Sequence, residues 1–358
     1  MKKILTAALA MLVFLSLGAQ EIRYFNAAEL NVIGKAIPTA KDFTRIDTAA
    51  YKFNDKVIEE YACHSTGLAV LFATDSPIIK ARWQTSQKNA EENFTAIAQK
   101  GLDLYIKKDG EWVFAGVARP DTKNVPYDKH EGTIVSNMAE GTKECLLYLP
   151  LYDRLDSLFI GVGTNSYIEP IENPFKYRIV VKGSSVTHGL AASRPGMTYG
   201  ARFGRDNGFY CFNLGFSGNA LLDMEIAQLM ASVEDPALYI LDYAPNAYAD
   251  MIDENGEKFF RVIRDAHPDV PVIFIEDVIF PHTAYDNRIK EEVTMKNQAQ
   301  KRLYTRLKKS GEKKIYYISA EGMIGDDGEA TVDGIHFTDL GMMRYVDHVL
   351  PTIKKALR

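Results

Sequence analysis

Residues 177–189, YRIVVKGSSVTHG, join a run of buried-type residues to a turn that carries two adjacent serines, a threonine and a histidine between two glycines. The apolar run is typical of a strand that is buried on both faces. The turn could cradle a phosphate, could be an ordinary connection from a strand to a helix, or could present a nucleophilic serine. The GxxxxGK[ST] lysine and the GxGxxG spacing are both missing, so the sequence does not support a nucleotide site.

Four more runs of the same kind follow, and their starts recur at roughly thirty-residue steps, which is the spacing of repeated strand–helix–strand units. They cover residues 209–215, 238–245, 270–276 and 314–319. Most of the stretches between them show helical periodicity, and the longest, 286–309, is strongly charged. Residues 176–358 are therefore expected to form an α/β domain with a flavodoxin-like parallel sheet and helices on both faces.

The part of the chain before this sheet has a different pattern. Residues 21–175 contain short strand-like runs without a long helical period, and Asp109-Gly110 between two runs is a hairpin signal. The pattern predicts an all-β domain, an antiparallel sandwich or jelly roll. Because about 340 residues exceed what one hydrophobic core usually supports, the length also favours two domains.

The first twenty residues have the parts of a secretory signal peptide. Lys2 and Lys3 precede an apolar stretch, and the small residues Gly18 and Ala19 follow it. We therefore expect residues 1–20 to be removed and the mature protein to be periplasmic or secreted, with no later segment that inserts into a membrane. Three cysteines far apart in sequence do not make a disulfide framework, and a net charge of −5 without a basic run argues against nucleic acid as a partner.

Polar residues follow each strand of the predicted sheet, at the edge where α/β sheets bind ligands. Ser185 comes after the first strand and could act as a nucleophile. The loop after the last strand holds Asp333 and His336, and of the seven histidines only His336 has an aspartate three residues before it. A serine nucleophile needs a base to accept its proton and a carboxylate to orient that base. The sequence thus predicts Ser185 as nucleophile, His336 as base and Asp333 as the partner of His336.

The order of these blocks resembles that of the SGNH, or GDSL-type, hydrolases. The blocks are GSS (183–185), NLGFSGN (213–219), PN (245–246) and DGIH (333–336), with SRPG (193–196) after the nucleophile. The resemblance implies an oxyanion hole formed by the N–H groups of Ser185 and Gly218 and by the side chain of Asn246. Residues 101–105, GLDLY, are similar to the GxDLY signature of a β-sandwich that precedes the hydrolase in two-domain carbohydrate acetylesterases.

Two positions depart from the family pattern. Ser184 stands where GDS has an aspartate, and Pro245 precedes Asn246 where the family has GxND. The loss of the aspartate removes a carboxylate beside the nucleophile but leaves the Ser–His–Asp set whole. Proline has no N–H to donate, and it stiffens the backbone before Asn246.

Three further residues near the strand ends are candidates for contacts with substrate. His188 lies three residues after Ser185, and Tyr243 and Glu276 lie at the ends of the third and fourth strands. His188 has no carboxylate in its turn to orient it as a base, so we expect it to line the pocket. Each of the three also has a structural alternative, because tyrosines usually pack and strand-end carboxylates often cap loops.

Together these features predict a serine esterase that removes a small acyl group, and the resemblance implies acetyl on a carbohydrate. The expected partner is an acylated oligo- or polysaccharide. We expect no cofactor and no metal, since neither HExxH nor a cysteine pair with ligand spacing occurs. The sequence makes no prediction of the oligomeric state. Two alternatives stay open: a lipid esterase, thioesterase or acyltransferase of the same fold, or a carbohydrate-binding protein whose hydrolase half is inactive.

Overall fold

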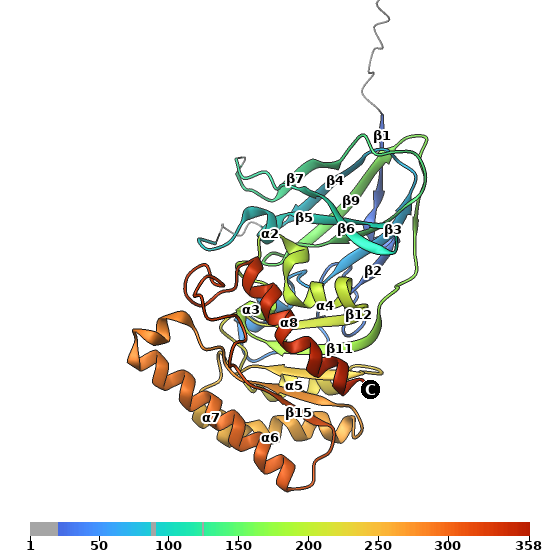
Figure 1. Cartoon of the computed structure of the whole chain (residues 1–358). Coiled ribbons are helices and arrows are strands. Elements are labelled where there is room, and N and C mark those ends of the chain that lie inside the picture. The colour runs from blue at the N-terminus through green and yellow to red at the C-terminus, as the bar shows by residue number, and fades with distance from the viewer. Residues whose placement is uncertain (1–20, 87–90, 124) are drawn as a thin grey trace, which may run out of the picture.

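The computed structural model describes residues 21–86, 91–123 and 125–358. The predicted signal peptide, residues 1–20, lies outside the described residues. An all-β half forms the upper part of Figure 1 and an α/β half the lower part. Within the described residues, no helix is long and apolar enough to cross a membrane.

Two antiparallel sheets make up the N-terminal half. One has the strand order β1-β9-β4-β7 and the other β10-β3-β8-β5-β6, with β2 paired to β3. Their apolar faces share one core, in which Phe72 and Leu104 of the second sheet pack with Trp83 and Leu158 of the first. This confirms the predicted sandwich. The strands are β1 (Ile22–Asn26), β2 (Asn31–Ile33), β3 (Ala69–Thr74), β4 (Ile79–Thr85), β5 (Leu102–Lys108), β6 (Glu111–Ala118), β7 (Lys129–Val135), β8 (Lys143–Tyr148), β9 (Leu155–Gly163) and β10 (Ile168–Pro170).

The second half is built on a parallel sheet with the strand order β12-β11-β13-β14-β15. Its pairs are parallel throughout, and Gly183 at the end of β11 lies in register with Gly215 and Asp242 of its two neighbours. The five predicted strands are confirmed. They are β11 (Lys176–Gly183), β12 (Phe209–Gly215), β13 (Leu238–Asp242), β14 (Val272–Ile275) and β15 (Ile315–Ile318).

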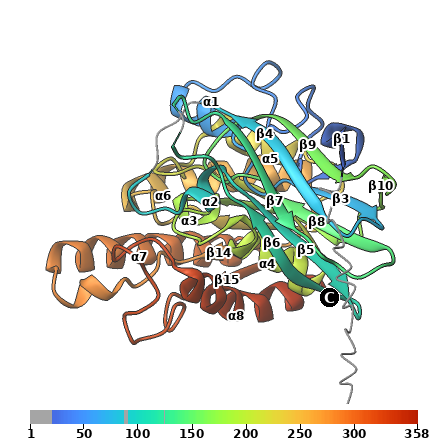
Figure 2. The same cartoon turned by 90° about the horizontal axis from the view of Figure 1, so that it is seen from above.

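Helices cover both faces of this sheet, as Figure 2 shows from above. Successive side chains of a strand point to opposite faces. Ile179 and Val181 of β11 therefore pack with α4 and α8, while Val180 packs with α5, α6 and α7. The helices of this half are α3 (Ser185–His188), α4 (Tyr199–Asn207), α5 (Met224–Ala231), α6 (Ala249–Ala266), α7 (Asn287–Lys309) and α8 (Asp339–Ala356), with the 3-10 turns η2 (Pro195–Met197) and η3 (Pro281–Ala284).

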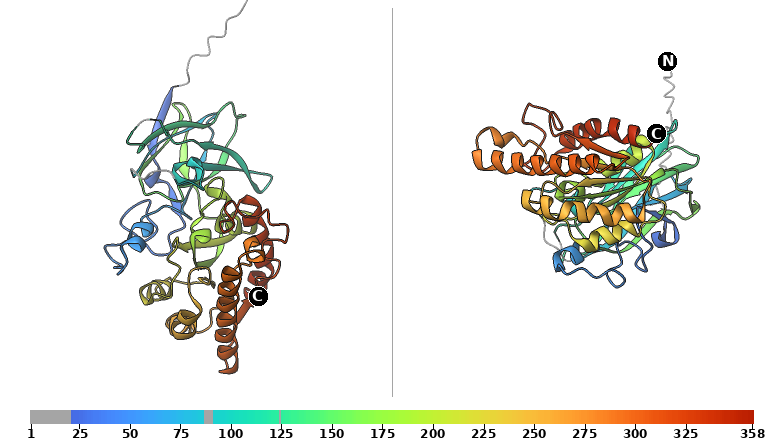
Figure 3. Two further views of the ribbon diagram at one scale, coloured as in Figure 1. Left: turned by 90° about the vertical axis from the view of Figure 1, so that its left-hand side faces the viewer. Right: turned by 90° about the horizontal axis from the view of Figure 1, so that it is seen from below.

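The N-terminal half also contributes short helices that no sequence pattern predicted. They are η1 (Ala27–Glu29), α1 (Lys56–Ala62) and α2 (Ala96–Lys100), each too short for a helical period to stand out. The segment that contains α1 leaves the sandwich and lies beside α5 (Figure 3), where Phe53 and Ile58 join the core that holds Ile226. The two halves therefore share buried apolar surface.

Candidate active site

Ser185 is the first residue of α3, directly after β11. A Cβ at Gly183 would lie 1.8 Å from Thr187 Oγ1, so a side chain there would push α3 off the sheet. The Ser184 hydroxyl accepts the N–H of Val186, so the residue in place of the family aspartate serves as the N-cap. This strand–turn–helix connection places Ser185 at the carboxyl edge of the sheet.

The structure brings Ser185, His336 and Asp333 into one hydrogen-bonded chain. His336 Nε2 lies 2.9 Å from Ser185 Oγ, and His336 Nδ1 lies 2.7 Å from Asp333 Oδ2. A carboxylate accepts hydrogen bonds, so Nδ1 carries the proton and Nε2 is left to accept the hydroxyl proton of Ser185. This is the arrangement that activates a serine for nucleophilic attack.

A tight turn fixes the Asp333 carboxylate. Its Oδ1 accepts the backbone N–H groups of Ile335 at 3.0 Å and His336 at 2.8 Å. Gly334, between Asp333 and Ile335, has φ +91°, a conformation that residues with a side chain rarely adopt. Burial alone would raise the pKa of Asp333, but the hydrogen bonds from His336, Asn93 and Ile335 outweigh it and hold the pKa well below its usual range. The carboxylate is therefore ionised.

The two remaining residues of the predicted oxyanion hole line the same pocket as Ser185. These residues are Gly218, in the turn after β12, and Asn246, after β13. The Asn246 Oδ1 accepts the N–H of Ala220 at 3.1 Å, so Nδ2 is the end of this amide that can donate to a ligand. The Lys296 ammonium donates to the carbonyl of Pro245 at 3.0 Å, which holds the turn that carries Asn246.

A buried lysine donates a hydrogen bond to the turn that carries Gly218. Lys182, with 0% of its surface exposed, donates from Nζ to the carbonyl of Asn219 at 3.3 Å and lies over the ring of Phe216. Burial lowers the pKa of this ammonium to about 7, and the charge of Asp223 offsets part of the effect. Sequence patterns did not single out Lys182, although a lysine directly after the apolar residues 179–181 is a signal that could have found it.

The pocket beside Ser185 has a volume of about 500 Å³. Three carboxylates line it, those of Asp242, Asp277 and Glu292. Burial raises the pKa of Asp242 to about 7, although the hydroxyls of Tyr199 and Tyr345 donate to its Oδ2 and partly oppose the rise. Burial likewise raises the pKa of Asp277 to about 6, against the opposing charge of Lys296. Much of the remaining wall is apolar and consists of Val186, Leu190, Val278, Phe280, Ile289 and Val293.

The three residues expected to contact substrate lie elsewhere. His188 has 0% of its surface exposed and stacks on Tyr152 of the N-terminal half, and this packing keeps its ring out of the pocket. Tyr243 is also fully buried and donates to Gln300. Glu276 accepts the hydroxyl of Tyr317 on the far side of the strand end, while its neighbour Asp277 faces the pocket. Their positions do not support a contact with substrate.

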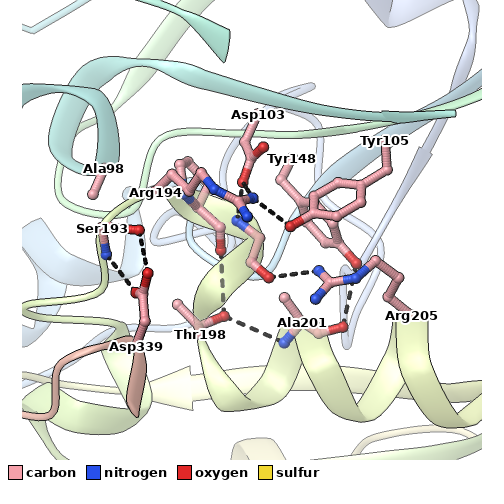
Figure 4. A network of polar contacts seen from close by, with 12 residues as sticks. Ala98, Asp103, Tyr105, Tyr148, Ser193, Arg194, Thr198, Ala201, Arg205 and Asp339 are labelled. Atoms are coloured by element: carbon pink, nitrogen blue, oxygen red, sulfur yellow. Dashed lines mark hydrogen bonds and ion pairs between the residues drawn. The ribbon is translucent and has the colours of Figure 1, made fainter. Parts of the chain in front are cut away.

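The SRPG loop after the nucleophile is clamped by the GxDLY strand, as Figure 4 shows. Asp103, fully buried on β5, accepts from Arg194 Nη1 and from the N–H of Gly196, both at 2.8 Å. Ser193 in turn donates its N–H and its hydroxyl to Asp339 at 2.9 and 2.6 Å. Asp339 begins α8, three residues after His336. The two sequence signatures therefore meet, and their contact reaches the His336 loop.

One polar group from the N-terminal half enters the site directly. The Asn93 amide donates from Nδ2 to Asp333 Oδ2 at 2.7 Å, and the same nitrogen lies 3.4 Å from His336 Nδ1. Sequence patterns did not single out Asn93, because 240 residues separate it from Asp333 and nothing local marks it.

Fold and site together define an α/β protein with a Ser–His–Asp arrangement at the carboxyl edge of its sheet, preceded by a β-sandwich. Residues 176–354 match the model of the GDSL-like lipase/acylhydrolase family, and residues 22–168 match the GxDLY model, the N-terminus of SGNH hydrolase-type esterases. The chain belongs to the GDSL-like lipase/acylhydrolase family. The resemblance seen in the sequence is confirmed, and the family supports an ester hydrolase.

Solved structures match most of the chain. A Bacteroides ovatus protein described as a GDSL-like lipase is 42% identical, with a TM-score of 0.91 over 94% of this chain and 98% of that one. A salicylyl-acyltransferase from a tetracycline biosynthetic pathway is 18% identical, with a TM-score of 0.72 over 94% and 99%. A family two carbohydrate esterase from Clostridium thermocellum, in complex with cellohexaose, is 12% identical, with a TM-score of 0.60 over 82% and 93%. At the two lower identities the likeness is one of fold. No curated protein matches the chain.

Proposed function

We propose that this protein is a serine esterase that removes a small acyl group, acetyl above all, from a carbohydrate. The observation that carries the proposal is the chain of two hydrogen bonds from Asp333 through His336 to Ser185, in a pocket at the carboxyl edge of the sheet. The sugar part of the substrate is supported by the fold shared with the family two carbohydrate esterases. A periplasmic or secreted location and the division into domains at 21–175 and 176–358 belong to the same proposal.

The chemistry follows from the geometry. Ser185 Oγ attacks the ester carbonyl while its proton passes to His336 Nε2. The N–H groups of Ser185 and Gly218 and the Asn246 amide stabilise the oxyanion. His336 then gives this proton to the leaving sugar oxygen as the ester C–O bond breaks, which releases the sugar hydroxyl and leaves an acyl-Ser185. Water attacks this acyl group while its proton passes to His336, and His336 returns the proton to Ser185 Oγ as acetate leaves.

A first test is hydrolysis of an aryl acetate by the purified protein and by Ser185→Ala. We expect the wild type to release acetate and the variant to lose this activity while its circular dichroism spectrum stays unchanged. The alternative of an inactive carbohydrate-binding protein predicts equal background rates for both. A panel of acetylated oligosaccharides, followed by mass spectrometry for the loss of acetyl, would then identify the sugar.

A second test separates the roles of His336 and Asp333. Because His336 transfers the proton, His336→Ala should lower kcat/KM by about 10²- to 10⁴-fold. Asp333→Asn should lose less, since the aspartate only orients and stabilises the base. Initial rates for the two variants at several pH values provide the measurement. If Asp333→Asn matches the wild type, the site works as a Ser–His dyad.

The pocket also favours a second candidate, an esterase or acyltransferase for a larger acyl group. A volume of about 500 Å³ with apolar walls at Phe280, Ile289 and Val293 is more than an acetyl group needs. Comparing kcat/KM for aryl acetate and aryl octanoate decides between them. Acetate preference supports the carbohydrate esterase, with the pocket holding sugar, and octanoate preference supports the alternative.

A further inference from the structure

We propose that Asn93, which the β-sandwich half supplies, is a positioning residue of the active site: it holds Asp333 in place and thereby orients the imidazole of His336. The inference rests on the proposed function, in which His336 is the base. It gives the N-terminal half a role in positioning the catalytic base, beyond forming a wall of the cleft or binding sugar.

Asn93 donates to the same oxygen of Asp333 that accepts the hydrogen bond from His336. Asn93 Nδ2 donates to Asp333 Oδ2 at 2.7 Å, and this oxygen also accepts the Nδ1–H of His336 at 2.7 Å. The other oxygen, Oδ1, is already engaged by two backbone N–H groups of its own turn. Asn93 is therefore the contact from outside the turn that restrains Oδ2.

The segment that carries Asn93 is anchored on both sides of the domain boundary. Thr95 caps α2 by accepting the N–H of Ala98, and its hydroxyl donates to the carbonyl of Ser193 at 2.6 Å. The ring of Phe94 packs edge-on against Tyr152, with 5.1 Å between the ring centroids. A residue held by such contacts can position its partner, because its own side chain has little freedom to lose.

The helix and strand that follow Asn93 also contact the SRPG loop. The helix α2 runs directly into β5, whose Asp103 fixes the SRPG loop (Figure 4). Ser193 of that loop binds Asp339 at the start of α8. The N-terminal half thus contacts the loop of Asp333 and His336 directly, through Asn93. It also contacts this loop indirectly, because Asp103 holds the SRPG loop and Ser193 of that loop binds Asp339.

The contact has an electrostatic consequence that packing alone would not have. The Asn93 amide stabilises the negative charge on Asp333 Oδ2 by donating a hydrogen bond to it. Without this hydrogen bond, the carboxylate interacts more strongly with the imidazole and favours the protonated ring. Activity that needs the neutral ring should then begin at higher pH. Other titratable or charged groups line the same pocket as His336, and Asp339 begins α8 three residues after it. The pocket groups are Asp242, Asp277, His282, Arg288, Glu292, Lys296 and Tyr345, and the substitution leaves all of them in place.

The experiment compares Asn93→Ala and Asn93→Asp with Asn54→Ala in the full chain. Asn54 is a matched control because its amide also donates to a carboxylate across the two halves, that of Glu225, away from the site. The measurements are kcat, KM and the pH dependence of aryl acetate hydrolysis, together with NMR titration of the histidine ring nitrogens. The His336 signals are identified by their loss in His336→Gln.

We expect Asn93→Ala to lower kcat by roughly ten- to a hundredfold, the value of a hydrogen bond to a charged group, with little change in KM. The acid limb of the pH profile should move to higher pH, and further for Asn93→Asp, which adds a negative charge. Asn54→Ala should leave both unchanged.

The proposal is overturned if Asn93→Ala keeps the kcat and the pH midpoint of the wild type. It is also overturned if Asn93→Ala lowers kcat without moving the midpoint, which would indicate packing alone. If the wild type hydrolyses no ester, the proposed function fails instead. The NMR titration then still decides on Asn93, because its removal must shift the His336 signals while Asn54→Ala does not.

Discussion

Lys182 illustrates how a single residue couples the nucleophile strand to the oxyanion turn. It sits two residues before Ser184, yet its ammonium lies under the turn of the neighbouring strand, where it donates to the carbonyl of Asn219. An ammonium that is fully buried is costly in its charged form, which is why its pKa falls to about 7. A group whose pKa is about 7 therefore contacts the turn that carries Gly218, through the carbonyl of Asn219.

This burial predicts a pH dependence of stability that Lys182→Met removes. In the unfolded chain the pKa of the lysine is near 10.5, so between pH 7 and 10 the unfolded state binds more protons than the native state. The free energy of unfolding contributed by this group therefore rises with pH in that window. From pH 7 to 8.5, the wild type should gain about 1 to 2 kcal/mol relative to Lys182→Met, measured by urea unfolding. A difference that stays constant with pH would contradict the buried ammonium.

Among the elements, the contact of β5 with the SRPG loop explains why the two signatures occur in one chain. Asp103 is fully buried, and its carboxylate is matched by Arg194 and by the N–H of Gly196. Arg194 also lies over the ring of Phe114 and donates to the hydroxyl of Tyr105. The loop after the nucleophile therefore owes its shape to a strand of the other half.

Asp103→Ala should destabilise the protein and also impair the site. Removing one partner of a buried ion pair leaves the other uncompensated, so we expect the free energy of unfolding to fall by about 3 kcal/mol. Asp156→Ala is the matched control, because its pair with Arg154 is exposed and should contribute less than about 1 kcal/mol. Denaturant unfolding and aryl acetate hydrolysis measure the two effects. Equal losses of unfolding free energy for the two variants would show that the buried pair of Asp103 and Arg194 contributes no more than an exposed pair.

For the molecule as a whole, the interface between the halves is continuous with the core of the parallel sheet. Arg45, buried in the segment before α1, donates to the carbonyls of Asn213 at 2.9 Å and Gly215 at 3.0 Å, on the strand that leads to the Gly218 turn. Phe53 and Ile58 of the same segment pack into the hydrolase core. The halves should therefore unfold as one unit.

Calorimetry can test this cooperativity. We expect a single transition whose van't Hoff and calorimetric enthalpies agree. Arg45→Met removes the side-chain donor to the carbonyls of Asn213, Gly215 and Tyr61, so it should lower the free energy of unfolding by about 3 kcal/mol and shift the whole transition. Two resolved transitions, or a shift of only one half, would show that the sandwich and the parallel sheet are thermodynamically independent.

The fold class was predictable because its signals are local. Short strand-like runs with turn signals before residue 176, and apolar runs separated by helical periodicity after it, are patterns that neighbouring residues already contain. The same rule of strand ends selected the loops that hold Ser185 and His336, which the structure brings within hydrogen-bond distance. Their catalytic roles remain a proposal.

The orientation of side chains within those loops needed the tertiary structure. His188 and Tyr243 follow strands as expected, but packing against the sandwich and α7 buries them away from the pocket. Asn93 reaches Asp333 only because the sandwich docks on the carboxyl edge of the sheet. The sequence of this protein thus determined its elements and the loops at their ends, since these depend on neighbours in the chain. The side chains that meet were decided by the docking of the two halves, because contacts across 240 residues leave no local pattern.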